Sequence, residues 1–146
     1  MNLLITGAAG FLGARLARTL LQRGTLSGQP LERVVLTDLF PPPADLLADP
    51  RVEARTGPLL AQVAALRDDD LAFDGVFHLA SAVSGECELD FDLGMASNLD
   101  STRALLDALR HRVVQRGEAP ARLVFASSVA VFGPDEDHPL PALVTD

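Results

Sequence analysis

Short apolar runs bounded by turn residues recur along the chain and predict β-strands. The first run, Leu3-Leu4-Ile5, offers apolar side chains to both faces of a strand, which is typical of a central strand in a parallel sheet. The run that contains Val52 is the weakest, and its strand is expected nearest the sheet edge. The five predicted strands span residues 2–6, 33–37, 51–56, 74–80 and 122–126.

Between these strands the apolar positions change to a helical spacing. The first helix is predicted to follow the glycine-rich stretch after the first strand and to end at Gly24. A short helix is predicted over residues 59–66, and a long amphipathic helix, closed by Gly117, over residues 98–116. The segments expected to be irregular are residues 25–32, the stretch after the proline run 41–43, residues 81–92 and the tail 134–146.

Strands that alternate with helices in this way predict a parallel sheet built by right-handed crossovers. The expected fold class is α/β, with a Rossmann-type doubly wound parallel sheet in a single domain over residues 1–146. Five strands are most of such a sheet but not all of it. The domain is therefore expected to be truncated after about five strands, with the later strands and the substrate-binding region absent.

The composition suits one globular domain, because 48% of the residues are hydrophobic and 22% are charged. The net charge of −8 and the lack of a basic patch argue against nucleic acid as a partner. No apolar run approaches the ~20 residues that a membrane span needs, so no membrane partner is expected. Cys87 is the single cysteine, which leaves no internal disulfide, and no metal site is predicted. The expected location is the cytoplasm.

Gly7, Gly10 and Gly13 follow the first predicted strand with the spacing G-x-x-G-x-x-G. The diphosphate of a dinucleotide needs free backbone N–H groups and the positive end of a helix, without bulky side chains in the way. Gly7 would permit the tight turn, Gly10 the approach to the phosphates, and Gly13 close packing of the helix. The alternative is a structural turn that binds no ligand.

Asp38 ends the second predicted strand, where an acid accepts hydrogen bonds from the adenosine ribose. A carboxylate there would also repel a 2′-phosphate. Two unit charges about 4 Å apart interact by roughly 4 kcal/mol at an effective dielectric of ~20, which is enough to select NAD over NADP. The predicted cofactor is therefore NAD, and the domain is interpreted as an NAD-binding Rossmann domain. A solvated turn aspartate is the alternative.

Four motifs in order give the chain its resemblance to a known family: the glycine loop, DGVFHLAS, NLDST and LVFASSVAVFG. Together they resemble the extended short-chain dehydrogenase/reductase family, which includes nucleotide-sugar epimerases and dehydratases. VSGECELDFDLGM followed by NLDSTRALLDALR is most similar to its D-erythronate dehydrogenase branch. That similarity implies an NAD-dependent oxidoreductase that oxidises a sugar acid, such as D-erythronate, at a secondary hydroxyl. An epimerase or dehydratase acting on a nucleotide sugar is the alternative within the family.

The resemblance also implies roles for individual residues. Ser128 falls on the active-site serine of the family, whose hydroxyl hydrogen-bonds the reacting oxygen of the substrate. Its place after a parallel strand agrees, although Ser127 and Ser128 also suit an ordinary turn. The implied cofactor-binding positions are Gly7, Gly10, Phe11 and Leu12 along the diphosphate with Gly13 completing the loop, Asp38 at the ribose, Leu79, Ala80 and Ser81 beside the cofactor, and Asn98 at the head of the long helix.

Three positions depart from the family pattern or stand outside it. Pro58 occupies a position where the family often has an aspartate near the adenine, which leaves that contact without its usual partner. Ser101 stands where glycine is usual in the long helix. His78 lies inside a predicted strand and is interpreted as a hydrogen-bonded core residue rather than a catalyst.

The chain contains no tyrosine and no lysine, since all twelve basic residues are arginine. The family resemblance implies that a Tyr-x-x-x-Lys pair performs the proton transfer, with the lysine lowering the tyrosine pKa. The 146 residues by themselves are therefore expected to be inactive, as the front part of a longer oxidoreductase that acts on a sugar or sugar acid. A second hypothesis is a non-catalytic dinucleotide-sensing module, which predicts a stable monomer or homodimer that binds NAD.

Overall fold

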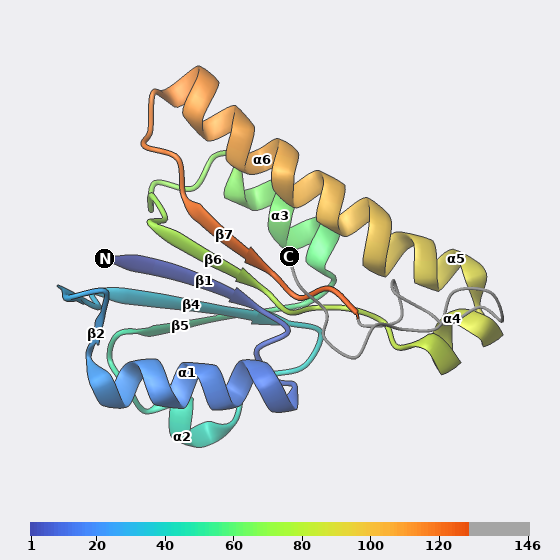
Figure 1. Cartoon of the computed structure of the whole chain (residues 1–146), viewed down its shortest axis with the longest axis horizontal. Coiled ribbons are helices and arrows are strands. Elements are labelled where there is room, and N and C mark those ends of the chain that lie inside the picture. The colour runs from blue at the N-terminus through green and yellow to red at the C-terminus, as the bar shows by residue number, and fades with distance from the viewer. Residues whose placement is uncertain (129–146) are drawn as a thin grey trace, which may run out of the picture.

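A computed structural model of the chain describes residues 1–128 (Figure 1). Five of its strands form one parallel sheet in the order β5-β4-β1-β6-β7, so the sheet has the predicted central first strand and the predicted edge position of the third. The tail expected over residues 134–146 lies outside the described residues. The strands of this sheet are β1 (Asn2–Thr6), β4 (Arg33–Asp38), β5 (Val52–Thr56), β6 (Gly75–His78) and β7 (Arg122–Phe125).

Helices cover both faces of the sheet. The helices α1 (Phe11–Arg23) and α2 (Ala44–Leu47) lie on one face, and α3 (Leu59–Leu66) and α6 (Ser101–Arg116) lie on the other (Figure 1). Side chains alternate across a strand, so successive residues of one strand pack into the cores on opposite faces of the sheet. Val34 and Leu36 belong to the core under α1, and Val35 to the core under α3 and α6.

The order of connections makes this a doubly wound sheet. From β1 the chain extends the sheet through β4 and β5 in one direction, and then returns to add β6 and β7 on the other side. The connections on the two sides of β1 diverge, and in such sheets a crevice opens there, outside the carboxyl ends of the strands. The Rossmann-type prediction is confirmed, and the ligand-binding edge of the sheet is thereby located.

Residues 25–32 were expected to be a loop, but four of them form a two-stranded hairpin of β2 (Thr25–Leu26) and β3 (Gln29–Pro30). Its two turn residues both have positive φ, with Ser27 at 52° and Gly28 at 79°. Positive φ at both central positions gives the turn a twist that matches paired antiparallel strands. Strands of two residues are too short for the periodicity of side chains to reveal.

The proline run was expected to prevent regular structure after it, and this was wrong at α2. Pro43 precedes the helix, with φ of −51° and ψ of 142°, and the N–H of Leu46 donates to its carbonyl oxygen at 3.0 Å. A proline at the start of a helix costs nothing, because the first N–H groups have no intrahelical acceptor in any case.

Residues 81–92 were also expected to be a loop, yet most of them are helical. The chain forms α4 (Ser84–Leu89), α5 (Phe91–Gly94) and a π-helical segment η1 (Met95–Asp100), which continues into α6. The long helix therefore reaches further toward the N-terminus than the predicted start at residue 98. None of these three segments contains a buried residue, so no apolar stripe marks them in the sequence.

Candidate functional site

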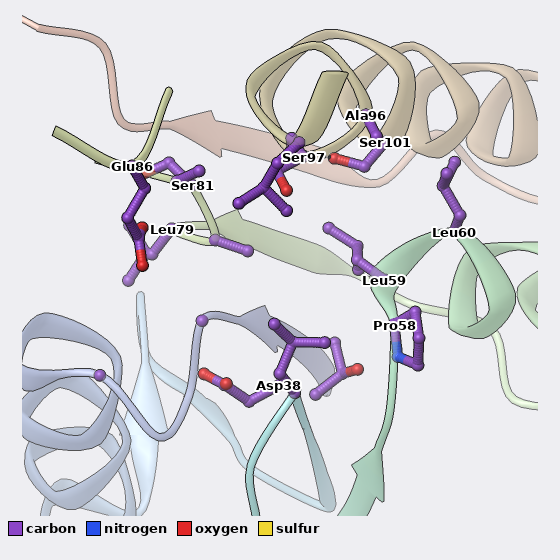
Figure 2. A pocket seen from close by; sticks show the side chains of 17 residues that line it. Asp38, Pro58, Leu59, Leu60, Leu79, Ser81, Glu86, Ala96, Ser97 and Ser101 are labelled. Atoms are coloured by element: carbon purple, nitrogen blue, oxygen red, sulfur yellow. Dashed lines mark hydrogen bonds between the residues drawn. The ribbon is translucent and has the colours of Figure 1, made fainter. Parts of the chain in front are cut away.

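A cavity of about 510 Å³ opens at the carboxyl ends of the strands (Figure 2). The loops after β1 and β6, the end of β4, the start of α3 and the α4–α6 segment all contribute to its wall. This is the crevice position that the strand order predicts. The lining residues are Gly7, Gly10, Thr37, Asp38, Leu39, Pro58, Leu59, Leu60, Leu79, Ala80, Ser81, Ala82, Glu86, Leu93, Ala96, Ser97 and Ser101.

The glycine loop is shaped by contacts that leave no room for side chains at two of its positions. Gly7 has φ of +71°, and a Cβ there would lie 2.8 Å from the backbone of Leu79 and Ala80. Gly13 lies in the first turn of α1, where a Cβ would lie 2.2 Å from the carbonyl oxygen of Gly7. The start of α1 is thus held tightly against the loop, with no acidic residue in its first turn. This bare backbone cradle and helix N-terminus fit a diphosphate group.

Phe11 and Leu12, the first two residues of α1, have side chains that are 80% and 62% exposed. Neither side chain lines the cavity. These residues can therefore contribute backbone N–H groups at the head of the helix, because the first such groups lack intrahelical acceptors. Their role along a diphosphate stays a prediction.

Asp38 is the last residue of β4, and its half-buried carboxylate lines the cavity. One carboxylate oxygen accepts a hydrogen bond from the N–H of Ala9 at 2.9 Å, and the other accepts one from Phe40 at 3.2 Å. Asp38 therefore ties the glycine loop to the end of β4. No arginine lines the cavity among the described residues, so the charge of Asp38 meets no cation there.

A buried hydrogen-bond chain fixes the loop after β6. The hydroxyl oxygen of Thr6 accepts hydrogen bonds from the N–H groups of Leu79 and Ala80, both at 3.1 Å. The same oxygen lies 2.7 Å from Nδ1 of His78, and Nε2 of His78 lies 2.9 Å from the hydroxyl of Thr102. Two accepted bonds leave Thr6 to donate its proton to Nδ1, so Nε2 carries the ring proton.

His78 is a core residue, as the sequence predicted, with a side chain that is 1% exposed. Burial lowers the pKa of its imidazole, which favours the neutral ring that this hydrogen-bond chain requires. The chain continues from Thr102, whose hydroxyl donates to the carbonyl oxygen of Asn98 at 2.7 Å. His78 therefore links the end of β6 to the head of α6, and it does not line the cavity.

Asn98 lies behind the cavity wall rather than in it. Its side-chain oxygen accepts a hydrogen bond from the N–H of Ala82 at 2.8 Å, and its amide donates to the carbonyl oxygen of Ala82 at 3.0 Å. Ala82 in turn lines the cavity. Asn98 thus shapes the site indirectly, by fixing the loop after β6 against η1.

Ser128 follows β7 at the same edge of the sheet and is exposed, but it does not line the cavity. Its catalytic role stays a prediction. Leu79, Ala80 and Ser81, by contrast, all lie in the cavity wall, where the sequence placed them.

Several cavity residues were not among the site residues predicted from the sequence, although Pro58 and Ser101 stood out there as departures from the family pattern. The start of α3, with Pro58, Leu59 and Leu60, and the helical segment with Glu86 and Ser97 contribute much of the wall. The first three directly follow a strand in a parallel sheet, which is a usable signal. The others stand on helices that the sequence did not reveal. The remaining lining residues not predicted are Thr37, Leu39, Ala82, Leu93, Ala96 and Ser101.

Within residues 1–128, no helix combines the length and apolar character needed to cross a membrane. In the same part of the chain, histidine, cysteine and acidic side chains do not gather in groups of three that could hold a metal ion.

Known proteins resemble this chain in sequence and in fold. The sequence pattern of the "NAD dependent epimerase/dehydratase family" matches residues 3–145. A D-erythronate dehydrogenase from Cupriavidus necator is 49% identical over 150 aligned residues, which cover all of this chain and 43% of that protein. The chain thus spans less than half the length of this curated relative.

Solved structures agree in fold. A nucleoside-diphosphate-sugar epimerase from Agrobacterium tumefaciens is 44% identical with a TM-score of 0.81, over 97% of this chain and 43% of that one. A uronate dehydrogenase from the same species, as a mutant complexed with NAD, is 28% identical with a TM-score of 0.62, over 87% and 40%. The chain corresponds to the N-terminal part of such proteins, and NAD is the cofactor of the family. The chain therefore belongs to the NAD dependent epimerase/dehydratase family.

Proposed function

We propose that these 146 residues are the NAD-binding part of an NAD-dependent oxidoreductase that acts on a sugar-derived substrate. The cavity at the carboxyl ends of the strands carries the proposal, because a bare glycine cradle, a helix N-terminus and an acid at the end of β4 meet in it. These three features are what a dinucleotide requires at its diphosphate and ribose. The family membership supports the same cofactor.

Each part of the cavity takes one part of the cofactor. Gly7, Gly10 and the first N–H groups of α1 bind the diphosphate. Asp38 accepts hydrogen bonds from the adenosine ribose while it keeps its bond to Ala9, since each carboxylate oxygen has two acceptor positions. Leu79 contributes apolar surface to the cavity wall. When bound, NAD supplies the hydride acceptor; the protein supplies position and exclusion of water.

The proposed substrate of the whole enzyme is a sugar acid, and D-erythronate is the leading candidate. The support is the 49% identity to a D-erythronate dehydrogenase across the whole of this chain. Proton transfer falls to residues outside these 146, because the chain has no tyrosine and no lysine. Ser128, after β7, is proposed to hydrogen-bond the reacting oxygen of the substrate.

One observation favours a second candidate, a dinucleotide-sensing module without catalysis. A chain that lacks both tyrosine and lysine can still bind NAD, since none of the cavity residues depends on either. The two candidates share the cofactor site and differ only in whether chemistry follows binding.

Calorimetric titration of the 146-residue chain tests the cofactor site. NAD should bind at least about tenfold more tightly than NADP, because a 2′-phosphate would meet the carboxylate of Asp38. Asp38→Asn should reduce that preference, and Asp92→Asn, an exposed acid outside the cavity, should leave it unchanged. Failure of the wild-type chain to bind NAD would refute the proposal.

The sequence of the source gene beyond the codon for Asp146 separates the two candidates. A Tyr-x-x-x-Lys pair further along, and NAD reduction by the longer protein with D-erythronate but not with UDP-glucose, supports the dehydrogenase. Ser128→Ala should then lower kcat by about 10²-fold or more, as expected for loss of a group that acts on the reacting oxygen. A stop codon directly after Asp146 would favour the sensing module.

A further inference from the structure

Thr37 carries a buried hydroxyl that the hydrogen-bond network of the described residues leaves without a partner. The residue lies one position before the end of β4 and is 2% exposed. Because side chains alternate along a strand, Thr37 faces the same side as Val35, which packs in the core under α3 and α6. Thr37 also lines the cavity. Its side chain therefore lies on the α3–α6 side of the sheet, at a residue that borders the cavity.

That end of the cavity is lined mainly by apolar side chains, with Ser97 and Ser101 as the polar members of its wall. Pro58, Leu59 and Leu60 at the start of α3 form one wall, and Ala96 and Ser101 form the opposite one (Figure 2). Ser101 does not offer a free hydrogen, since its hydroxyl donates to the carbonyl oxygen of Ser97. Among the described residues, Thr37 is the one whose hydroxyl is buried and has no hydrogen-bond partner.

The position of this apolar end identifies the part of a ligand it faces. In Figure 2, Pro58, Leu59 and Leu60 lie on one side of Asp38, and Leu79 and Glu86 lie on the other. A dinucleotide with its diphosphate at the glycine loop and its ribose at Asp38 would place the attached base beyond Asp38, between α3 and α6. Apolar walls suit the faces of a flat purine ring.

We infer that the Thr37 hydroxyl hydrogen-bonds the purine base of the bound dinucleotide, an inference that rests on the proposed cofactor site. A threonine hydroxyl can rotate to donate to a ring nitrogen or to accept from an exocyclic amino group. The base thus provides the hydrogen-bond partner that the Thr37 hydroxyl lacks within the described residues. An unsatisfied buried hydroxyl lowers the stability of the empty protein, and the ligand recovers that loss on binding.

This assignment predicts that one substitution raises the stability of the empty protein and lowers its affinity for NAD. Thr37→Val removes the unpaired hydroxyl and keeps the branched shape, so the empty protein should become more stable, with a Tm raised by a few degrees. The same change should weaken NAD binding about 5- to 20-fold, since a hydrogen bond to the base is lost. A hydroxyl that only supports the fold would give the reverse pattern, with lower stability and unchanged affinity.

The test combines thermal unfolding of the empty chain with calorimetric titration of NAD and of ADP-ribose, which lacks the nicotinamide. Thr37→Val should weaken both ligands equally, and Thr37→Ser, which keeps the hydroxyl, should restore the affinity. Thr19→Val is the matched control, because the Thr19 hydroxyl already donates to the carbonyl oxygen of Arg15 at 3.0 Å on the outer helix α1.

The outcomes distinguish this inference from the cofactor proposal. If wild-type protein binds NAD and Thr37→Val binds it equally well, the inference is wrong and the cofactor site stands. A loss for NAD but not for ADP-ribose would place the hydroxyl near the nicotinamide and would also overturn it. If the wild-type chain binds neither ligand, the proposed function fails and the inference fails with it.

Discussion

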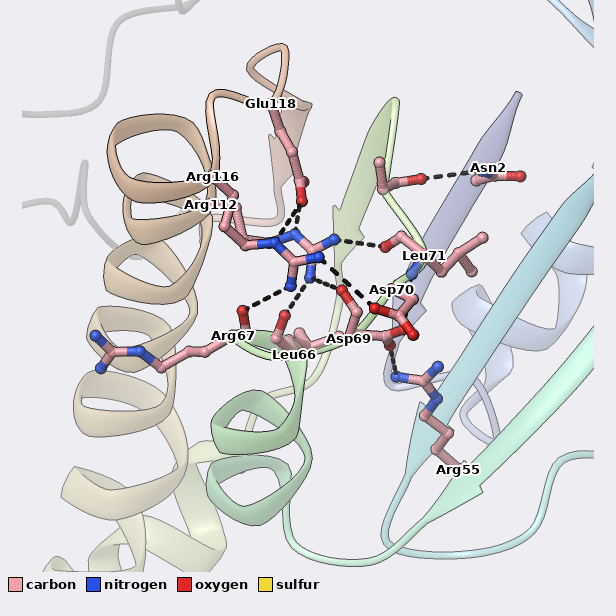
Figure 3. Close-up of polar contacts among 11 residues, drawn as sticks. Asn2, Arg55, Leu66, Arg67, Asp69, Asp70, Leu71, Arg112, Arg116 and Glu118 are labelled. Carbon is pink, nitrogen blue, oxygen red and sulfur yellow. Dashed lines mark hydrogen bonds and ion pairs between the residues drawn. The ribbon is translucent and has the colours of Figure 1, made fainter.

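The two ends of the sheet differ in whether every buried polar side chain of the described residues has a partner. At the amino ends of the strands, around Arg112, the donors and acceptors of a buried cluster are paired with one another (Figure 3). At the carboxyl ends, the cavity contains a buried hydroxyl on Thr37 without a partner. A closed network holds elements together, whereas an unpaired buried group needs a ligand or a water molecule. We therefore expect the amino ends of the strands to stabilise the domain and the carboxyl ends to bind a ligand.

Arg112 is the centre of the closed cluster. Its side chain is 3% exposed, and its guanidinium donates to the backbone carbonyl oxygens of Asp69 at 2.9 Å and Leu71 at 2.8 Å, as well as to that of Leu66. It also pairs with Glu118 at 2.8 Å and lies 5.9 Å from the centre of the Phe73 ring. One side chain thereby joins α6 to the end of α3 and to the connection into β6.

A second arginine extends this network toward the outer strand. Arg55 on β5 forms ion pairs with Glu53 at 2.7 Å and Asp69 at 2.5 Å. Burial alone would raise the pKa of Asp69, but the N–H of Leu71 and the Arg55 guanidinium lower it below its usual value. The acid therefore stays ionised and keeps its ion pair with Arg55.

The largest effect is expected from breaking the closed cluster. Arg112→Leu would leave three carbonyl oxygens without their buried donor, while Glu118 keeps its ion pair with Arg116 at 3.0 Å; the change should reduce the free energy of unfolding by about 3–5 kcal/mol. Arg110→Leu on the same helix is the control, since Arg110 is 74% exposed and should change stability by less than about 1 kcal/mol. Urea unfolding of both variants measures the difference, and equal losses would contradict the account of the cluster.

The next effect concerns the opposite end of the sheet. Gly13→Ala would force a Cβ to within 2.2 Å of the Gly7 carbonyl oxygen, so the start of α1 must move away from the glycine loop. A loss of about 1–3 kcal/mol in stability and of at least about tenfold in NAD affinity is expected. Gly85→Ala meets open space and serves as control. Unaltered NAD affinity in Gly13→Ala would show that this packing does not shape the cofactor site.

The smallest effect is a dependence of stability on pH through His78. Burial lowers the pKa of His78 in the folded protein, so the unfolded chain binds the proton more readily. Stability from this residue is complete above the unfolded pKa of about 6.5 and falls as the pH drops from there toward the folded pKa, by at most about 1.4 kcal/mol per pH unit. Unfolding between about pH 7.5 and 5.5 should show this slope in the wild type and in His111→Gln. The slope should shrink in His78→Gln, and its persistence there would assign it to another group.

Local signals let the sequence predict the sheet and the glycine cradle. Gly7, Gly10 and Asp38 follow strands whose apolar runs are unmistakable, and a parallel sheet brings the ends of its strands to one edge. Their positions therefore needed no knowledge of tertiary contacts. The core role of His78 followed from its place within an apolar strand.

Other features depend on partners distant in sequence, and the pattern could not contain them. Arg112 stands on an amphipathic helix where an arginine ordinarily faces water, and only the carbonyl oxygens at the end of α3 explain its burial. The helices α4 and α5 bury no residue, so they lack a periodic apolar face. Thr37 has the appearance of an ordinary strand residue, and only the full hydrogen-bond network reveals its unpaired hydroxyl.

The central claim, that the carboxyl ends of the strands hold NAD while the opposite end only stabilises the fold, can be tested residue by residue. Backbone amide NMR shifts of the 146-residue chain would be followed during titration with NAD. The account predicts saturable shifts at Gly7, Gly10, Asp38 and Leu59, and none at Glu118. Shifts centred on the Arg112 cluster, or none at the glycine loop, would contradict it.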